Sequence, residues 1–414
     1  MSERWAMDPQ TESLSFRASG FDWRLFCGDH VIESNLRRAV ERVDAKRAMV
    51  ICSPSIANRT NLLARIAEAL QARYVGCFDG IQKDSTFESV NAATHAARDR
   101  GADLLIAVGG GSVIVSTRAV AIFLGEPGDP FEIMTQYPDD GRPYSPRLMA
   151  PKLPIINIPT TPTSAMNRAG TGLKNPGLSH RMEYFDPKTR PSAIFIDDGA
   201  LMTAPTSLIR STATTVFASL IGSSAHGSPN PLVEADQSQA FNLGVSAYRR
   251  LGVEIDNPML RRNLSLSAFL QNRAEDDGRA LTRSGPFSGD YAVSTALHIR
   301  YPHVGQGEST SVLQGPAIRI AKPEELGAAE RVARGLDVFE DGMTQAAAAA
   351  AVVDCLHGLY TENGMPPNLR SLGVEPEDFD AIAAETVKNF NARVGRGTPQ
   401  ERIERTLRLL NAAW

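Results

Sequence analysis

The first half of the chain alternates short apolar runs with segments of helical spacing, and this alternation constrains the fold more than any other feature. The apolar runs are residues 47–52, 74–78, 104–108 and 153–158, and the helical segments between them are residues 61–72, 86–100 and 113–124. Strands that are apolar along their whole length lie inside a sheet covered on both faces, and intervening helices make that sheet parallel. We therefore predict an α/β domain with a parallel sheet over residues 1–204.

The second half of the chain has a different pattern, because strand signals almost vanish after residue 205. The segments that favour helix are residues 231–251, 263–273, 324–335, 344–363, 375–394 and 398–414. We predict an all-α domain over residues 205–414, with the cleft between the two domains as the default binding site. The polar stretch 125–152 is long for a connection, and we interpret it as an exposed excursion rather than a lid.

Composition excludes several classes of protein. The 43 basic and 47 acidic residues give a formal net charge of −4, and no block of like charges reaches five, which argues against a nucleic-acid groove. The longest apolar run, residues 346–353, is too short to span a bilayer. The first ten residues lack the pattern of a signal peptide. The four cysteines form no CxxC pair, so we expect buried thiols in a reducing, cytoplasmic compartment.

A glycine-rich turn is the sharpest motif, and it follows the apolar run 104–108 directly. It consists of Gly109, Gly110, Gly111 and Ser112. Glycines let the backbone approach a ligand closely, and the following helix points free amides and its dipole at that place, so a pyrophosphate is the natural guest. The hydroxyl-rich turn 159–164 after the next apolar run could also bind phosphate or ribose. Neither motif is the GxGxxG or GxxxxGK pattern, and both turns could also exist without a ligand.

These motifs together resemble a known family. The segments GGGSVIVSTRAVA and LPIINIPTTPTS are similar to the group III (iron-containing) alcohol dehydrogenase superfamily, with the maleylacetate reductase branch as the nearest match. Segments 50–55, 180–182, 193–197, 229–231 and 371–385 carry the same resemblance along the chain. It implies a dehydroquinate synthase-like fold, with a Rossmann-like first domain and NAD(P) in the cleft.

The resemblance also implies roles for particular residues. Gly109 to Ser112 would bind the pyrophosphate, and Ser53 and Pro54 would lie near the adenine ribose. The residues implied on the nicotinamide side are Thr160, Thr161 and Ser164. Arg181 and Arg118 replace lysines of the family pattern, and Val115 replaces its aspartate. The family usually forms dimers through the N-terminal region, which makes residues 16–26 the expected swapped or paired strand of a homodimer.

The metal ligands of the family are the part of the pattern that this chain lacks. Thr215 stands at the position of the aspartate and Ser219 at that of the first histidine. Tyr291, Ala292 or, in a looser alignment, His298 corresponds to the second histidine, and Gln306 or His303 to the third. Hydroxyls and amides are poor ligands for iron or zinc, so we predict no catalytic metal.

Three interpretations of function follow. We expect a metal-independent NAD(P)H-dependent reductase of a small carbonyl or oxo-acid substrate, in which hydrogen-bond donors replace the metal. The candidates are Tyr291, Gln306, Thr215 and Ser219 as donors, and His298 or His303 as the proton donor. A non-redox hydrolase or lyase acting in the same cleft and a pseudoenzyme remain the alternatives. Asp290 or Glu308 could act as a base if burial raised its pKa.

The expected partner is an anionic small molecule, with neither nucleic acid nor membrane involved. Arginines suit such a substrate because the guanidinium group pairs with carboxylates in a fixed geometry. The candidate arginines are Arg142, Arg147, Arg181, Arg210, Arg283 and Arg300.

Overall fold

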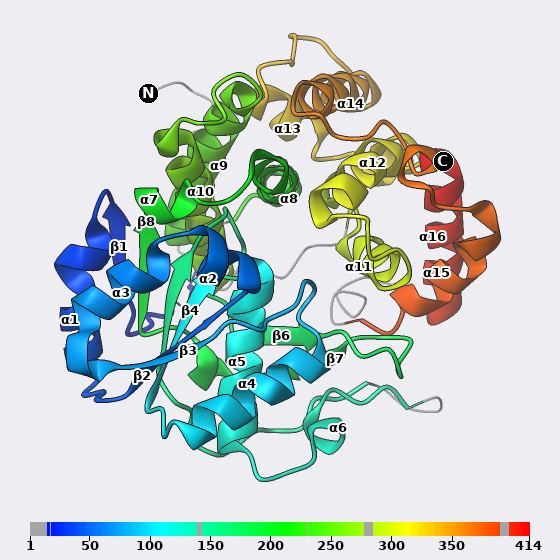
Figure 1. Ribbon diagram of the computed structural model, residues 1–414. Helices are drawn as coiled ribbons and strands as arrows, with labels where there is room; N and C mark the ends of the chain where they lie inside the picture. Colours follow the sequence, from blue (N-terminus) through cyan, green and yellow to red (C-terminus); the bar gives the residue numbers. More distant parts are fainter. Residues whose placement is uncertain (1–14, 17, 139–142, 229, 277–284, 390–396) are drawn as a thin grey trace. The chain divides into compact units, whose positions relative to one another are not determined.

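The computed structural model describes residues 15–16, 18–138, 143–228, 230–276, 285–389 and 397–414 (Figure 1). Its contacts divide the chain into two compact units, one of residues 21–205 and one of residues 206–414 together with the segment before Phe21. We call them the α/β unit and the helical unit. No helix among the described residues is long and apolar enough to cross a membrane.

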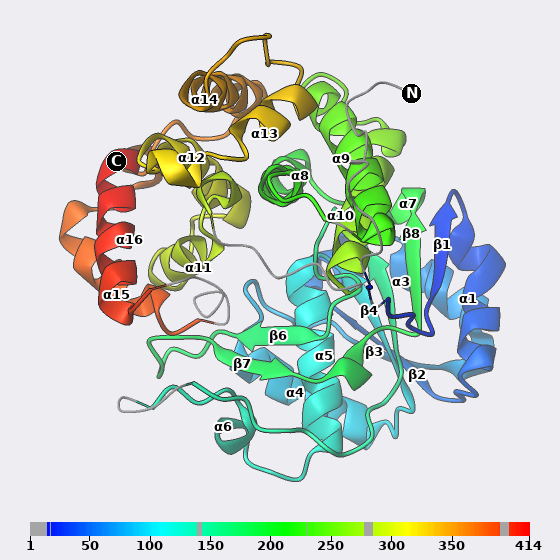
Figure 2. The ribbon, with the colours of Figure 1, turned by 180° about the vertical axis from the view of Figure 1, so that it is seen from behind.

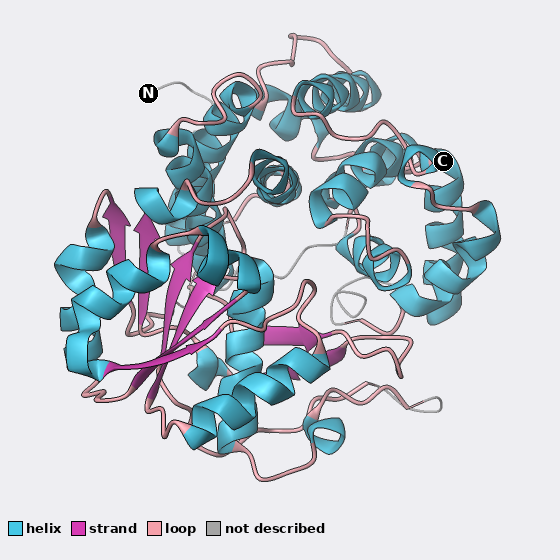
Figure 3. Ribbon diagram, in the orientation of Figure 1, coloured by secondary structure: helices cyan, strands magenta, loops and turns pink. Residues whose placement is uncertain are grey.

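The α/β unit is built on a six-stranded parallel sheet in the order β1-β8-β5-β4-β2-β3. The strands are β1 (Arg24–Gly28), β2 (Ala48–Cys52), β3 (Tyr74–Phe78), β4 (Leu104–Gly109), β5 (Ile155–Pro159) and β8 (Ala193–Asp197). Four of them confirm the predicted apolar runs, and β1 and β8 extend the sheet beyond the prediction. The predicted parallel α/β architecture is therefore confirmed (Figure 3).

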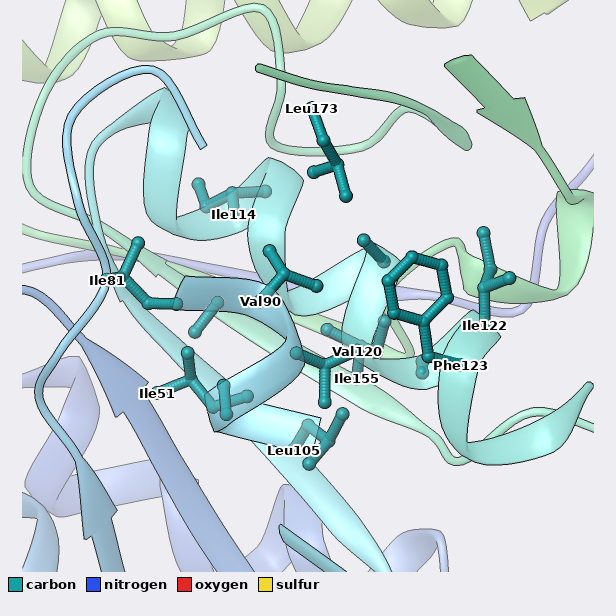
Figure 4. Close-up of a cluster of buried hydrophobic side chains, with 14 of the residues drawn as sticks. Ile51, Ile81, Val90, Leu105, Ile114, Val120, Ile122, Phe123, Ile155 and Leu173 are labelled. Carbon is teal, nitrogen blue, oxygen red and sulfur yellow. The ribbon is translucent and has the colours of Figure 1, made fainter. Parts of the chain in front are cut away.

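Both faces of this sheet are buried, which explains why its strands are apolar without alternation. Alternate residues of the central strands enter two separate hydrophobic clusters. One cluster contains Leu105 and Ile155 and is covered by α4 (Phe87–Asp99) and α5 (Gly111–Gly125), as Figure 4 shows. The other is covered by α1 (Val31–Arg42) and α3 (Leu62–Leu70). The short helices α2 (Pro54–Arg59) and α7 (Asp198–Leu201) begin directly after β2 and β8.

The long connection 125–152 is less exposed than we predicted. It contains the short helix α6 (Pro130–Ile133), and its Met134 and Leu148 side chains belong to the hydrophobic cluster under α5. The side chain of Lys152 is fully buried and pairs with Glu126 and Asp186. Residues 139–142 lie outside the described part of the chain. The connection is anchored to the core near both of its ends because apolar side chains interrupt its polar sequence.

Two further strands form an antiparallel hairpin beside α5, namely β6 (Gly170–Leu173) and β7 (Met182–Phe185). Strand β1 lies at the edge of the main sheet and pairs with β8 of the same chain, from Arg24 opposite Ala193 to Gly28 opposite Asp197. Phe26 and Phe195 stack at this pairing, with ring centroids 4.7 Å apart. Of the segment 16–26 expected to pair between two copies, only residues 24–26 belong to this strand, and Arg17 lies outside the described residues.

The helical unit contains no strand among its described residues, which confirms the all-α prediction. Its helices are α8 (Thr206–Ser224), α9 (Pro231–Leu251), α10 (Pro258–Asp276), α11 (Tyr291–Arg300), α12 (Gln306–Arg319), α13 (Ala329–Gly335), α14 (Gln345–Glu362), α15 (Phe379–Thr386) and α16 (Pro399–Ala413). Helices α8, α9 and α10 pack together, and α11, α12, α15 and α16 share a second core (Figure 2). The helix expected over residues 375–394 is shorter, and residues 390–396 lie outside the description.

Candidate functional site

Three of the predicted cofactor-binding segments meet at one edge of the sheet in the α/β unit. Strands β2, β4 and β5 are neighbours, and because they are parallel their carboxyl ends lie side by side. Ser53 and Pro54 follow β2, the glycine turn follows β4, and the turn 160–164 follows β5. This edge is where open α/β sheets bind their ligands. The structure therefore brings together segments that lie far apart in the sequence.

The glycine turn lies directly against the hydroxyl-rich turn. A Cβ atom at Gly110 would lie 3.2 Å from the Oγ1 atom of Thr161, and one at Gly111 would lie 3.2 Å from that of Thr163. Gly109 has a φ of 156° and leaves no room for a side chain, since its Cβ would lie 2.7 Å from Val113. The close approach of the two turns therefore leaves little room for side chains at Gly110 and Gly111, and Val113 excludes one at Gly109.

An anion fits the space at the start of α5. The backbone N–H groups of Gly111 and Ser112, at the first two positions of this helix, have no acceptor within the helix. The Oγ1 atom of Thr161 is buried, and no described residue gives it a hydrogen-bond partner. Free amides, the positive end of the helix dipole and an unpaired hydroxyl all favour a phosphate oxygen. These residues therefore fit the pyrophosphate of a dinucleotide.

Ser112 and Arg181 both contact a strained loop between β3 and α4. Asp84 and Ser85 adopt left-handed backbone conformations with φ of 64° and 56°. The backbone N–H of Asp84 donates to the Ser112 hydroxyl over 3.2 Å, and Arg181 donates to the Asp84 carbonyl over 3.2 Å. The Ser112 hydroxyl therefore retains its proton for another acceptor. One nitrogen of the Arg181 guanidinium group, in contrast, is already bonded to the main chain.

The other predicted cofactor residues occupy structural positions at the same edge. Ser53 is the N-cap residue of α2, and its hydroxyl lies 2.9 Å from that of Ser55, while Pro54 occupies the first turn. The backbone N–H of Thr160 donates to the Gly109 carbonyl over 3.1 Å, so it joins the turns after β4 and β5. Ser164 is half-buried in the turn after β5.

Two buried residues that sequence reasoning did not assign to the site determine the shape of the turn after β5. Arg118 donates to the carbonyl oxygens of Ala165 and Arg168 over 2.9 and 2.6 Å. Asn157 donates to the carbonyl of Met166 over 2.7 Å. Burial and the nearby guanidinium groups of Arg168 and Arg190 lower the pKa of Arg118 to about 9. The arginine in the family's lysine position therefore holds the backbone of this turn.

In the helical unit, the positions corresponding to the family's metal ligands lie on α8, α11 and α12. Ser211, Thr215 and Ser219 are spaced four residues apart on α8 and so share one face of that helix. Helix α12 packs against this face so closely that a Cβ atom at Gly307 would lie 2.0 Å from the Ser211 carbonyl oxygen. The face is therefore a row of hydroxyl groups beside the start of α12.

Ser211 caps helix α12 from a neighbouring helix. The N-cap residue of α12 is Gly305, which has no side chain to accept a hydrogen bond. The Ser211 hydroxyl instead accepts the N–H of Gly307 over 3.3 Å and donates to the carboxylate of Glu308. This arrangement performs the function of a capping box with the hydroxyl supplied from α8. Glu308, three residues after the N-cap residue Gly305, is the only sign of this arrangement in the sequence.

Removing this cap is expected to destabilise the helical unit moderately. Ser211→Ala leaves the Gly307 amide and the Glu308 carboxylate without their shared partner, so we expect a loss of about 1 kcal/mol in the free energy of unfolding. Urea denaturation followed by circular dichroism measures it. Thr212→Ala is the matched control, because the Thr212 hydroxyl bonds only to the backbone of its own helix. Equal midpoints for the two variants would contradict the capping role.

The other two hydroxyls of this face differ in what they can still donate. Thr215 donates to the Ser211 carbonyl over 3.2 Å, which leaves the side chain only as an acceptor. Ser219 accepts a hydrogen bond of 2.8 Å from Nε2 of Gln271 on α10, so its own proton remains available. Of the two predicted donors on α8, Ser219 therefore retains that capacity and Thr215 does not.

Gln306 is the first residue of α12 and carries a second available donor. Its Nε2 atom is buried, and no described residue accepts a hydrogen bond from it. Its backbone carbonyl accepts the hydroxyls of Ser309 and Thr310 over 3.1 and 2.7 Å, which orders the first turn of the helix. A buried amide N–H without an acceptor is costly unless a ligand supplies one.

The remaining predicted residues lie on α11, at its start and in the turn that follows it. His298 is buried and its Nε2 atom lies 3.2 Å from the Ser309 hydroxyl, which links α11 to α12. His303 lies on the surface with Nε2 2.9 Å from the Leu372 carbonyl. Tyr291 is half-buried at the start of α11. Burial raises the pKa of Asp290, but its carboxylate accepts the N–H of Val293 as the N-cap of α11.

The arginines suggested for an anionic substrate are partly engaged elsewhere. Arg300 pairs with Asp378 over 2.6 Å, and Arg210 donates to the Gly252 carbonyl over 3.5 Å. Arg142 and Arg283 lie outside the described residues. Arg181 remains the arginine of this set that lies near the glycine turn.

The donor set at the family's metal positions does not fit iron or zinc. Thr215, Ser219 and Gln306 supply hydroxyls and an amide, and no group of three His, Cys, Asp or Glu residues within the described ranges could hold a metal ion. A cation needs lone pairs directed at it. Here Nε2 of Gln271 points its positive end towards Ser219, and the Gln306 amide is a further N–H group. Ser219 and Gln306 therefore suit an electronegative oxygen, whereas Thr215 offers only lone pairs.

Comparison with known proteins identifies the family. Residues 24–198 match the profile of iron-containing alcohol dehydrogenases, and residues 288–414 match the C-terminal profile of the Fe-containing alcohol dehydrogenase family. The first match covers most of the α/β unit and the second covers the C-terminal part of the helical unit. The chain belongs to the iron-containing alcohol dehydrogenase family.

Its relatives are oxidoreductases. The chain is 23% identical to the lactaldehyde reductase of Escherichia coli K12 over 383 residues, which is 91% of this chain and 94% of that enzyme. It is 41% identical to maleylacetate reductase 2 of Cupriavidus pinatubonensis over 86 residues, 21% of this chain and 23% of that enzyme. The crystal structure of a 1,3-propanediol oxidoreductase has the same fold, with a TM-score of 0.79 at 20% identity, covering 97% of this chain and 100% of that one.

Proposed function

We propose that the protein is a metal-independent NAD(P)H-dependent reductase of a small carbonyl or oxo-acid substrate. The observation that carries the proposal is the combination of two features in one chain. The sheet edge proposed to bind phosphate keeps its glycine turn, with an unpaired Thr161 hydroxyl beside it. At two of the positions that the resemblance assigns to metal ligands, Ser219 and Gln306 carry donors that favour an oxygen over a cation.

The cofactor would be held by residues already described. The amides of Gly111 and Ser112 and the Thr161 hydroxyl would bind the pyrophosphate, and Ser53 lies at the neighbouring strand end, where a ribose is bound in such folds. Thr160 and Ser164 are proposed on the nicotinamide side by family resemblance. When bound, the dihydronicotinamide supplies the hydride that converts a carbonyl to an alcohol, with the balancing proton from water.

The chain's own residues would replace the Lewis acid by hydrogen bonding. Negative charge develops on the carbonyl oxygen as hydride arrives, and N–H or O–H groups fixed towards that oxygen stabilise it. Gln306 and Ser219 supply such donors, because the protons on Gln306 Nε2 and Ser219 Oγ are not bonded to other described groups. Thr215 can contribute only an acceptor, for example for a substrate hydroxyl.

A small anionic aldehyde or oxo acid is the substrate class that we propose first. Among the relatives are a maleylacetate reductase, a sulfoacetaldehyde reductase and a lactaldehyde reductase, so the test set contains the anions maleylacetate and sulfoacetaldehyde and the neutral lactaldehyde. Arg181, near the glycine turn, is the proposed anion-binding arginine. A hydrolase or lyase would instead act without NAD(P)H, and a pseudoenzyme would turn over none of these compounds.

The first experiment is a titration of metal-analysed protein with NADH and NADPH, followed by tryptophan fluorescence. We expect saturable binding of one or both cofactors to protein with less than stoichiometric iron and zinc. Absence of binding at millimolar cofactor would overturn the redox proposal. Stoichiometric iron or zinc in the active sample would overturn metal independence.

A variant tests the cofactor site directly. Thr161→Val removes the unpaired hydroxyl at nearly constant volume, and we expect the dissociation constant of the preferred cofactor to rise about tenfold, as for one lost hydrogen bond to a charged group. Thr117→Val is the matched control on α5, because the buried Thr117 hydroxyl bonds only to the backbone of its own helix. Equal dissociation constants for the two variants would show that the Thr161 hydroxyl does not bind the phosphate.

We further propose a cytoplasmic homodimer. None of the four cysteines forms a disulfide bond, which suits a reducing compartment, although Cys27 is exposed rather than buried as expected. Strand β1 is an edge strand, and no other strand of the described residues pairs with its outer side, where we propose that a second copy pairs. Sedimentation analysis at micromolar concentration distinguishes a dimer from a monomer.

A further inference from the structure

We infer that Gln271 is a positioning residue that fixes the Ser219 hydroxyl as a hydrogen-bond donor to an oxygen of the substrate. This inference rests on the proposed reductase function and deepens it. It identifies the group that orients the Ser219 side chain, which stands at the position of the family's first metal-binding histidine. Gln271 lies on α10, outside every motif of the sequence, and none of the resemblances assigns it a role.

The position of Gln271 restricts the hydrogen bonds that the Ser219 hydroxyl can form. Nε2 of Gln271 donates both to the Ser219 backbone carbonyl and to the Ser219 hydroxyl oxygen, each over 2.8 Å. The bond to the carbonyl determines which way round the amide lies, because a carbonyl only accepts. The amide therefore occupies a lone pair of the Ser219 hydroxyl, and the hydroxyl proton must turn to another acceptor.

The surroundings of Gln271 hold this amide in place. Its side chain is 1% exposed. Two residues further along α10, Arg273 forms a bidentate ion pair with Asp236 of α9, which ties the two helices together beside Gln271. A side chain this restricted keeps its orientation while substrate exchanges, which is the condition for a preorganised donor.

The direction of the Ser219 hydroxyl proton determines which ligand atom this residue favours. With one lone pair of its oxygen occupied by the Gln271 N–H, the Ser219 hydroxyl directs its proton to another acceptor, so the position favours a carbonyl oxygen or the alkoxide that forms from it. The Oε1 atom of Gln271 is buried, and no described residue donates to it. That oxygen is a further acceptor beside Ser219, suited to a water molecule or a substrate hydroxyl.

The test is a double-mutant cycle in the holoenzyme with NADPH or NADH and the best substrate among lactaldehyde, maleylacetate and sulfoacetaldehyde. Gln271→Met is expected to lower kcat about tenfold with little change in KM, because the interaction acts on the developing oxyanion. The same substitution in a Ser219→Ala background is expected to have no further effect on kcat. Ser265→Ala is the matched control, a buried α10 hydroxyl that bonds only to its own helix.

A second variant separates positioning from packing. Gln271→Glu keeps the size of the side chain but turns it into an acceptor, so the Ser219 proton is drawn towards residue 271 and kcat is again expected to fall. Cofactor affinity and the thermal midpoint, measured for every variant, show whether the fold is retained.

Three results would overturn the inference, and they are distinguishable. An unchanged kcat in Gln271→Glu, or effects of Gln271→Met and Ser219→Ala that multiply independently, would refute the positioning role while the reductase function stands. Failure of the unmutated protein to oxidise either cofactor with any of the three substrates would refute the function itself, and the inference with it.

Discussion

Gly307→Ala is expected to unfold the helical unit or to reduce its stability severely. The added Cβ atom would lie 2.0 Å from the carbonyl oxygen of Ser211 and 2.7 Å from its Cα atom. Both atoms belong to the backbone of α8, so no side-chain rotation relieves the overlap, and the two helices must separate. We expect a loss of about 3 kcal/mol or more in the free energy of unfolding. Urea denaturation followed by circular dichroism measures this loss.

The matched control for this prediction is Gly358→Ala. Gly358 also lies inside a helix, α14, and a Cβ atom there meets nothing within 4 Å. The intrinsic preference of alanine for helix should stabilise that variant by up to about 1 kcal/mol. If Gly307→Ala proved as stable as Gly358→Ala, the close packing of α8 on α12 would be refuted.

Gln306→Met is expected to produce the largest loss of activity among variants that remain folded. The substitution keeps the length of the side chain and removes the buried Nε2 group that no described residue satisfies. Loss of one oxyanion donor commonly lowers kcat about 100-fold, and we expect a decrease of that order. Stability should be retained or slightly raised, because a buried donor without a partner is removed.

A matched control for Gln306→Met is Gln400→Met. Gln400 lies on the exposed start of α16 and bonds only to Glu404 of the same helix. Steady-state kinetics with the best substrate of the test set should show an unchanged kcat for this control. A kcat within about twofold of the unmutated protein for Gln306→Met would remove Gln306 from the proposed site.

The strands that could be predicted from the sequence are those whose residues are all buried, because burial alone makes them apolar. The strands β2, β4 and β5 are buried along their whole length and produce continuous apolar runs. Strand β1 was not predicted as a member of this sheet, because an edge strand is partly exposed and tolerates residues such as Arg24. The hairpin β6–β7 was also missed, since strands of only four residues, of which β6 contains two glycines, carry almost no periodic signal.

The candidate site was predictable only where a local motif defines it. The glycine turn is evident in the sequence, because the close approach of Thr161 and Thr163 leaves little room for side chains at Gly110 and Gly111. Alignment with the family named Thr215, Ser219 and Gln306, but which of them retain a free proton depends on partners elsewhere. Gln271 lies 52 residues from Ser219 in the chain, and no pattern links positions so far apart.

The capping of α12 by Ser211 has a consequence for how the helical unit folds. The two residues of the Ser211–Glu308 bond are 97 positions apart, so the first turn of α12 is completed by a contact that requires closure of a long loop. Such a turn forms late, after α8 has docked, because the entropy of loop closure is lost before the hydrogen bonds are gained. The N–H groups at the start of α12 should therefore acquire protection from hydrogen exchange after those of its middle during refolding. An isolated peptide of residues 305–320 should fray at the end that carries Gln306.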